Sequence, residues 1–277
     1  MTNQTEESTS SSGAPTVLVT GAFSGLGRAF FEHFATERDV SSHGQVSDFR
    51  VVGIDREPWP DQDGQPRASH VHGPRSVYVQ VDVTSPAHEL EAFTRKWIGE
   101  ETPVHLVIHS AGVRGLVPSV EITRSEDVAG AETLEVMDAA TMMGTFEINA
   151  VGAFNVITAV LPNLRLAAQQ ALRPRVAVMS SRLGSVGGNH TGGGYAYRAS
   201  KAALNAVVRS LSVDVPEVCF GLVHPGRVET GLVCVKEDGA MTCEESLDGL
   251  LTLLDRLGDG SLGSGCFVDR FGVEIPW

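Results

Sequence analysis

Residues 16–27 read TVLVTGAFSGLG, and this short stretch decides the fold. Its first five residues, 16–20, are mostly β-branched, which predicts a buried strand. A glycine-rich turn follows at once, and Phe30, Phe31 and Phe34 then recur at helical spacing. A strand, a glycine loop and a helix in this order open a βαβ unit.

The same alternation continues along the chain. Further strands are predicted at residues 50–54, 76–81, 104–108, 175–179, 218–223 and 266–268. Helices are predicted at residues 86–98, over 131–172 as two helices with the second interrupted near Pro162, at 195–213, and up to 257 after a Thr242–Glu245 capping box. This alternation predicts an α/β fold, a single Rossmann-type, doubly wound parallel sheet with helices on both faces.

The remaining segments define the expected domain organisation. Residues 1–15 are rich in Thr, Ser and Glu and lack the basic and apolar regions of a secretory signal, so we expect a disordered tail. Residues 16–277 contain no linker and are expected to form one domain. Residues 56–75, rich in Pro, Gly, Asp and His, predict a loop in place of a crossover helix, and residues 39–48 predict a surface insertion.

The charge balance excludes some classes of partner. The chain carries 21 basic and 34 acidic side chains, a net charge of −13. Because such a surface repels phosphate backbones and anionic lipids, we expect no nucleic-acid and no membrane partner. No run of about 18 uncharged apolar residues occurs, which predicts no membrane span.

The four cysteines are scattered. They occupy positions Cys219, Cys234, Cys243 and Cys266. They form no C-x-x-C pair and have no histidine at metal-ligand spacing, so we expect no metal site. Reduced thiols and a cytoplasmic location are the expectation.

The glycine loop has the spacing of a dinucleotide-binding turn. Gly21 permits the turn out of the strand, Gly25 lets the backbone approach a pyrophosphate, and Gly27 lets the helix pack on the sheet. The helix N-terminus adds free N–H groups and the positive end of its dipole. Cofactor contacts are therefore expected from the loop residues Gly21, Phe23, Ser24, Gly25, Leu26 and Gly27.

Acidic residues end the next two strands. Asp55 is placed to accept hydrogen bonds from the ribose hydroxyls and to repel a 2′-phosphate, which favours NAD over NADP. Ser24 is not basic, which favours NAD as well, whereas Arg56 offers a partner for a 2′-phosphate. Asp82, followed by Val83, is expected to contact the adenine amino group.

Tyr197 and Lys201 form the second chemical motif. They lie four residues apart on a predicted helix and therefore share a face. A lysine cation favours the phenolate form of a tyrosine, so Tyr197 is a candidate acid/base for a carbonyl/alcohol pair. Ser181 is the candidate hydroxyl for orienting the substrate oxygen, with Ser180 and Ser185 as alternatives, and Asn149 is a candidate for holding a water against Lys201.

Six motifs in a fixed order carry a resemblance. TGxxxGxG, xxAG, NxxG, SSxxG, YxxxK and PG begin at residues 20, 109, 149, 180, 197 and 225. This order resembles the short-chain dehydrogenase/reductase superfamily. Residues 180–205 and 265–277 look like the subgroup that contains C-factor and the sniffer-type carbonyl reductases.

The resemblance implies roles for particular residues. It implies a catalytic tetrad of Asn149, Ser181, Tyr197 and Lys201 and a small-molecule alcohol or carbonyl as substrate. It also implies that Pro225, Gly226 and Thr230 hold the nicotinamide carboxamide. Further cofactor contacts are expected from Ser110, Ala111, Gly112 and Val228. The resemblance implies a homodimer or homotetramer.

Two departures from the family pattern bear on the site. The usual N-N-A-G is His109-Ser110-Ala111-Gly112 here, which we expect to alter sheet hydrogen bonding more than chemistry. The spacing of 16 residues from Ser181 to Tyr197 is longer than the commonest family spacing.

Arginines that follow the motifs raise the possibility of an anionic substrate. Arg114 and Arg227 are the candidates, whereas Arg182 and Arg198 are expected to pair with carboxylates. Residues 227–242 are the expected substrate lid.

The sequence thus predicts an NAD(P)-dependent oxidoreductase that interconverts a secondary alcohol and a carbonyl by hydride transfer. One alternative is a non-catalytic dinucleotide sensor on the same fold. Another is an epimerase or dehydratase with tightly bound NAD.

Overall fold

The structure, a computed structural model, describes residues 15–36, 38–40, 46–60, 65–123, 127–233, 235 and 238–277. The predicted tail, apart from Pro15, lies outside this range, as does Cys234. Cys219, Cys243 and Cys266 carry free thiols.

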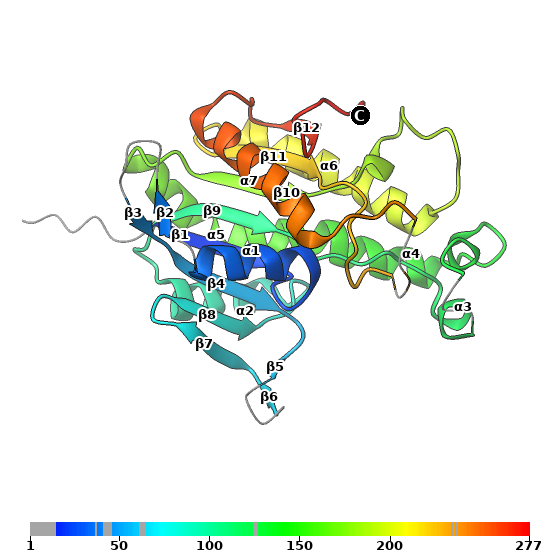
Figure 1. Ribbon diagram of the computed structural model, residues 1–277, viewed down its shortest axis with the longest axis horizontal. Coiled ribbons are helices and arrows are strands. Elements are labelled where there is room, and N and C mark those ends of the chain that lie inside the picture. Colours follow the sequence, from blue (N-terminus) through cyan, green and yellow to red (C-terminus); the bar gives the residue numbers. More distant parts are fainter. Residues whose placement is uncertain are drawn as a thin grey trace, which may run out of the picture.

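An eight-stranded sheet forms the centre of the molecule, in the order β12-β11-β10-β9-β1-β4-β8-β7 (Figure 1). Its strands are β1 (Thr16–Thr20), β4 (Arg50–Asp55), β7 (Ser69–Gly73), β8 (Ser76–Gln80), β9 (Val104–His109), β10 (Arg175–Met179), β11 (Cys219–His224) and β12 (Cys266–Asp269). Neighbouring strands are parallel except for β7 and β8, which are antiparallel. Each predicted strand is present, and the doubly wound parallel sheet is confirmed.

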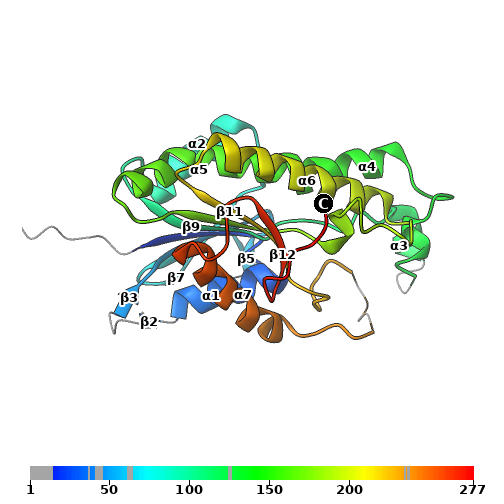
Figure 2. The same cartoon turned by 90° about the horizontal axis from the view of Figure 1, so that it is seen from above.

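Helices cover both faces of the sheet. They are α1 (Gly25–Thr36), α2 (Ala87–Phe93), α3 (Pro118–Thr123), α4 (Ala139–Phe146), α5 (Gly152–Gln169), α6 (Tyr195–Asp214) and α7 (Cys243–Asp259). Figure 2 shows α2, α5 and α6 on one face and α1 and α7 on the other. Separate apolar cores fill the two interfaces, and the predicted Thr242–Glu245 capping box starts α7.

One long helical run differs from its prediction. α4 passes through a π-helical turn, Glu147–Val151, directly into α5, and Pro162 lies inside α5 without ending it. Proline removes one backbone hydrogen bond, but buried Val160 and Leu164 continue the apolar face on either side of it. The run Ala139–Gln169 is apolar and long enough to cross a membrane by length and composition alone, yet half of its most apolar window is buried in the fold.

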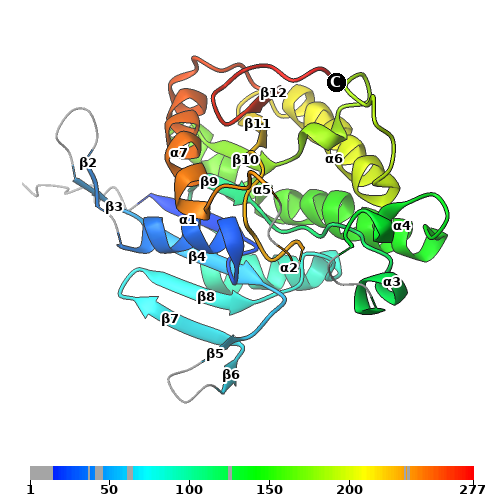
Figure 3. The same cartoon turned by 45° about the vertical axis from the view of Figure 1, so that its right-hand side comes forward.

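The prediction of a loop at residues 56–75 is wrong. The described part of it forms a small antiparallel pair, β5 (Trp59–Pro60) with β6 (Pro66–Arg67), and then β7, which extends the sheet (Figure 3). Trp59 is buried and stacks on His70, which provides an apolar anchor where a crossover helix is missing. An edge strand needs only one partner, so its sequence lacks the apolar run of a central strand.

The predicted surface insertion has its own secondary structure. β2 (Arg38–Val40) and β3 (Val46–Asp48) form an antiparallel pair that is separate from the main sheet. Figure 3 shows this pair projecting away from the body of the molecule.

The strand order reverses between β1 and β9. The chain winds outward from β1 through β4 and β8, and from β9 through β10, β11 and β12. Thr20 Oγ1 accepts hydrogen bonds from the backbone N–H groups of Ser110, at 3.2 Å, and Ala111, at 3.1 Å. Open α/β sheets bind ligands outside the carboxyl ends of their strands at such a reversal, so a site is expected here.

We expect two isosteric Thr→Val changes in β1 to affect the free energy of unfolding differently. Thr20→Val removes an acceptor that two backbone N–H groups share, which leaves partly buried donors unpaired and costs about 2 kcal/mol of unfolding free energy. Thr16 is equally buried, and among the described residues its Oγ1 has no hydrogen-bond partner. Thr16→Val should therefore be neutral or stabilising. Urea unfolding of the two variants provides the comparison, and an equal loss in both contradicts this role of Thr20.

Candidate functional site

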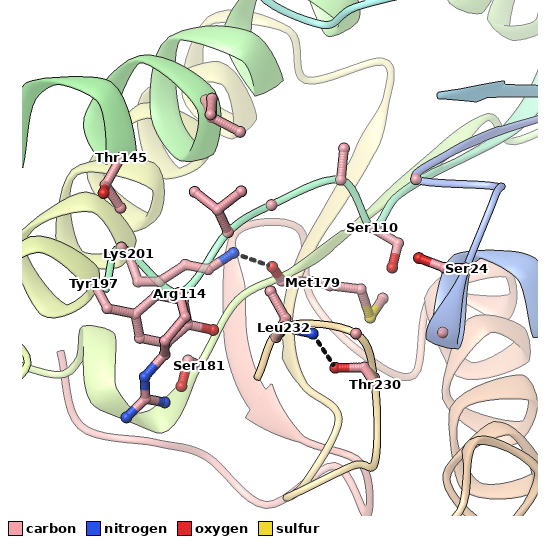
Figure 4. Close-up of a pocket in the computed structure, with 18 of the residues that line it drawn as sticks. Ser24, Ser110, Arg114, Thr145, Met179, Ser181, Tyr197, Lys201, Thr230 and Leu232 are labelled. Atoms are coloured by element: carbon pink, nitrogen blue, oxygen red, sulfur yellow. Dashed lines mark hydrogen bonds between the residues drawn. The ribbon is translucent and has the colours of Figure 1, made fainter. Parts of the chain in front are cut away.

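A cavity of about 590 Å³ lies at the carboxyl ends of the strands, next to the reversal of strand order (Figure 4). It collects most of the residues that the sequence predicted. These are Gly21, Ser24, Gly25, Leu26, Asp55, Arg56, Asp82, Val83, Ser110, Ala111, Gly112, Arg114, Ser181, Tyr197, Lys201, Pro225, Gly226, Val228 and Thr230. Phe23, Gly27, Asn149 and Arg227 were also predicted, but they do not line it.

The glycine loop packs too closely against its neighbours to accommodate side chains at three positions. Gly21 has φ +71°, and a Cβ there would lie 2.8 Å from the backbone nitrogen of Ala111. Gly25, at φ +53°, begins α1, and a Cβ there would lie 3.0 Å from the Cβ of Thr230. A Cβ on Gly27 would overlap the carbonyl oxygen of Gly21. Gly21 and Gly25 line the cavity where α1 begins, so the residues present fit a pyrophosphate on the α1 N-terminus.

The carboxylate of Asp55 is fixed at the end of β4. Its Oδ2 accepts from the backbone nitrogen of Phe23 at 3.2 Å, and its Oδ1 accepts from that of Glu57 at 3.1 Å. Arg56 is exposed, and its side chain lies 3.3 Å from the Glu57 carboxylate. The negative charge is thus held beside the cavity, whereas the nearest arginine has an acidic neighbour.

Asp82 and Phe23 were also expected to contact the cofactor, but only Asp82 lines the cavity. Asp82 lines the cavity, and its Oδ1 accepts hydrogen bonds from the backbone and the hydroxyl of Thr84, both at 2.8 Å. The prediction of a cofactor contact by Phe23 finds no support, because its ring packs edge-on against Trp59 instead of lining the cavity. Phe23 serves the site through its N–H, which orients Asp55.

Helix α6 carries Tyr197 and Lys201 on its buried face. The two side chains are neighbours, with Lys201 Nζ 5.7 Å from the centroid of the Tyr197 ring. Nζ donates to the carbonyl oxygen of Met179 at 2.9 Å, as Figure 4 shows. Burial lowers the pKa of Lys201 to about 8, so the side chain remains largely protonated at pH 7.

The structure separates the three candidate serines. Ser181 lines the cavity, and its Oγ accepts from the backbone nitrogen of Leu183 at 3.2 Å. Ser180 also lines the cavity, but its Oγ donates to Asn205 Oδ1 at 2.6 Å, so that hydroxyl is used inside the fold. Ser185 lies outside the cavity lining. Ser181 is therefore the hydroxyl best placed to meet a substrate.

Asn149 acts on the loop after β9. It is fully buried in the π-helical turn, and its Oδ1 accepts from the backbone nitrogen of Val113 at 2.8 Å. Its Nδ2 donates to the carbonyl of Val113 and to Ser200 Oγ, both at 2.9 Å. The side chain that we expected to hold a water against Lys201 is engaged in joining this loop to α6.

His109 takes part in the sheet rather than in the cavity. Its Nδ1 lies 3.0 Å from Thr20 Oγ1, which links β9 to β1. Burial, reinforced by the charge of Lys201, lowers the pKa of His109 to about 3, so the ring is neutral at pH 7. This placement agrees with the expected effect on sheet hydrogen bonding.

The two arginines proposed for an anionic substrate are engaged elsewhere. Arg114 lines the cavity but binds Glu132 through Nε at 2.9 Å and Nη2 at 2.8 Å. Arg227 is not at the cavity, and it donates to the carbonyl of Asp238 at 2.9 Å. The prediction that Arg227 binds substrate is thus not supported, and the charge of Arg114 is already balanced.

The other two arginines were expected to pair with carboxylates. Arg182 does so, with Asp269 at 3.6 Å. Arg198 instead donates to the carbonyl of Gly193 and to Thr191 Oγ1, at 3.1 and 2.9 Å, within the loop that precedes α6.

Sequence reasoning missed one wall of the cavity. This wall is the face of α4 and the following turn, formed by Ala140, Thr141, Gly144, Thr145 and Ile148. Their helical spacing was the available signal, but alanine, glycine, threonine and isoleucine are too common on helices to mark a site by themselves. His224 at the end of β11 was also missed, and burial lowers its pKa to about 4.

Part of the expected lid borders the cavity. Val228, Thr230, Gly231 and Leu232 line it. Two backbone hydrogen bonds hold the described ends of residues 227–242 together. The nitrogen of Glu229 donates to the carbonyl of Met241 at 2.8 Å, and the nitrogen of Met241 donates to the carbonyl of Arg227 at 2.9 Å.

Comparisons with known proteins agree with this geometry. Residues 15–239 match the short chain dehydrogenase family. The chain is 42% identical to the C-signal protein of Myxococcus xanthus over 177 residues, which cover 63% of this chain and 93% of that one. It is 32% identical to 1-hydroxy-2-glutathionyl-2-methyl-3-butene dehydrogenase of a Rhodococcus species over 201 residues, 71% of this chain and 78% of that one.

Solved structures show the same fold. The NADPH-bound carbonyl reductase from chicken fatty liver superposes with a TM-score of 0.73 at 25% identity, covering 95% of this chain and 99% of that one. The carbonyl reductase Sniffer of Drosophila melanogaster gives the same TM-score at 22% identity, covering 96% and 100%. The chain therefore belongs to the short-chain dehydrogenase/reductase family and is an NAD(P)-dependent oxidoreductase.

Proposed function

We propose that the protein interconverts a secondary alcohol and a carbonyl, with Tyr197 as the acid/base. The observation that carries this proposal is the convergence of Tyr197, Lys201 and Ser181 on one cavity that also contains the glycine loop. Figure 4 shows the Tyr197 and Ser181 side chains beside one another in this cavity. A hydroxyl, a phenol and a buried ammonium are the groups that proton transfer to a carbonyl oxygen requires.

Each residue has a part in the proposed reaction. A bound nicotinamide dinucleotide supplies or accepts the hydride. Ser181 Oγ donates a hydrogen bond to the substrate oxygen and stabilises the charge that develops on it. Tyr197 gives its phenolic proton to that oxygen in reduction and takes it back in oxidation, and Lys201 favours the phenolate form through its charge.

Asp55 supports NAD as the preferred cofactor within this proposal. Its carboxylate is held at the cavity by two backbone N–H groups, where it would repel a 2′-phosphate. The NADPH bound to the chicken carbonyl reductase argues for the phosphorylated form instead. The two cofactors must therefore be compared directly.

The open wall of the cavity at α4 favours a bulky substrate. Gly144 lies inside α4, where glycine costs helix stability relative to alanine, and a Cβ there would meet no atom within 4 Å. Packing thus gives no reason for glycine, whereas an open cavity wall does. The Rhodococcus relative is named for a substrate with a glutathionyl group, which is also large.

Tyr197→Phe tests the acid/base assignment. Loss of the phenolic hydroxyl should lower kcat/KM for carbonyl reduction at least about 100-fold, because general acid catalysis contributes that much. Dinucleotide binding, followed by fluorescence titration, should be unchanged because the ring remains. Retained turnover contradicts the assignment. Absence of any net NAD(P)H oxidation or formation by the wild type would favour the sensor or the epimerase instead.

Asp55→Asn tests the cofactor preference. The amide keeps one acceptor oxygen for the loop but removes the negative charge. We expect the ratio of kcat/KM for NADH to that for NADPH to fall about tenfold, in line with the loss of one charge-assisted hydrogen bond. A wild type that prefers NADPH would overturn the role given to Asp55.

Gly144 variants test the room for the substrate. Gly144→Ala should raise the unfolding free energy by about 1 kcal/mol, because alanine favours the helix. Gly144→Leu should raise KM for bulky aryl ketones while leaving small aldehydes and the dinucleotide Kd unaffected. A uniform loss of activity on all carbonyls would show that this wall does not select by size.

A further inference from the structure

Two cations lie near the Tyr197 ring. Lys201 Nζ is 5.7 Å from the ring centroid, and Arg114 Cζ is 4.9 Å from it. Lys201 belongs to the same helix as Tyr197, whereas Arg114 comes from the loop after β9. Figure 4 shows the Arg114 side chain running alongside the ring.

Glu132 fixes the guanidinium in place. The two hydrogen bonds from Arg114 to this carboxylate are 2.9 and 2.8 Å long and use both oxygens. Only 18% of the Arg114 side chain and 13% of the Glu132 side chain are exposed. A shielded bidentate pair of this kind fixes the plane of the guanidinium.

The backbone around Glu132 ties the same parts together. The carbonyl of Glu132 accepts from the nitrogen of Gly194, at 3.1 Å, directly before α6 begins. The carbonyl of Ala131 accepts from the nitrogen of Val117, at 2.9 Å, in the loop that carries Arg114. The turn η2 (Gly130–Glu132) therefore connects the loop of Arg114 to the helix of Tyr197.

Other titratable and charged groups lie around the site. The carboxylates of Asp55 (β4), Asp82 (after β8) and Glu121 (α3) line other parts of the cavity. His109 on β9 and His224 on β11 are uncharged at pH 7, because burial lowers the pKa of each, to about 3 and about 4. Arg182 pairs with Asp269, and Arg198 is directed to Thr191 and Gly193. Lys201 and Arg114, the latter paired with Glu132, are thus two cations placed against the Tyr197 ring.

We propose that Arg114, held by Glu132, is a positioning residue that favours the phenolate of Tyr197 and fixes the plane of its ring. This inference rests on the proposed role of Tyr197 as acid/base. A cation on the face of an aromatic ring is attracted to it, and the attraction strengthens when the ring carries a negative charge. It also explains why this arginine lines the cavity while its charge is balanced by a carboxylate.

A phenol titration tests the proposal without relying on turnover. The chain has three tyrosines, and burial raises the pKa of Tyr78 well above its usual value, so that phenol does not interfere. The tyrosinate absorbance near 295 nm is recorded against pH for each variant, and the same variant with Tyr197→Phe is subtracted. Arg114→Gln should raise the Tyr197 midpoint by about half a pH unit or more.

The charge-neutral replacement of Glu132 supplies the matched control. Glu132→Gln removes the counter-charge and leaves the arginine, so the Tyr197 midpoint should fall. Both replacements weaken the Arg114–Glu132 ion pair. If the role of this pair were purely structural, the two Tyr197 midpoints would move in the same direction. A shift of both Tyr197 midpoints in the same direction, or no shift in either variant, overturns the proposal.

Two further measurements complete the test. Arg114→Lys keeps a cation and should recover part of the shift seen in Arg114→Gln, and the pH profile of kcat/KM for alcohol oxidation should follow the same order. If the wild type turns over no alcohol or carbonyl, the proposed function fails while the phenol titration still reports on Arg114. If turnover is normal and the midpoints do not separate, only the inference about Arg114 fails.

Discussion

The close approach of the two loops that leave β1 and β9 is the constraint on which the site depends. The backbone of residue 21 passes so near Ala111 that no side chain fits between them, and the Thr20 hydroxyl binds two N–H groups of the opposite loop. A glycine and a small hydroxyl residue therefore stand together at the reversal of strand order. This contact sets the width of the crevice that receives the dinucleotide.

The same loop after β9 then determines the position of the chemistry. Gly112 passes between Asn149 and Lys201, and a Cβ there would lie 3.0 Å from Asn149 Oδ1 and 3.5 Å from Lys201 Nζ. Asn149 binds the next residue of the loop, Val113, and also Ser200 on α6. One segment of backbone thus places the glycine loop, the buried ammonium and the Tyr197 helix relative to one another.

Much of this arrangement could be predicted from sequence because the signals were local. The strands are short runs of β-branched residues, and Tyr197 and Lys201 are related by helical spacing. The contacts of Asn149 and Arg114 could not be predicted, because each depends on a partner distant in the chain, Val113 and Glu132. The strand β7 was missed because an edge position imposes little apolar pattern on its sequence. The cavity wall formed by α4 was missed because its mostly small residues form no recognisable sequence motif.

The replacement of a crossover helix by β7 has a consequence for how the sheet assembles. β7 and β8 are joined by a short turn, with Gly73 paired to Ser76. Parallel pairs such as β1 with β9 join residues almost 90 positions apart, for example Thr20 with His109. Local pairs cost less chain entropy to close and form faster than distant ones. Within the main sheet, the β7–β8 pair therefore joins the residues nearest in sequence, and we expect its closure to cost less chain entropy than that of any parallel pair.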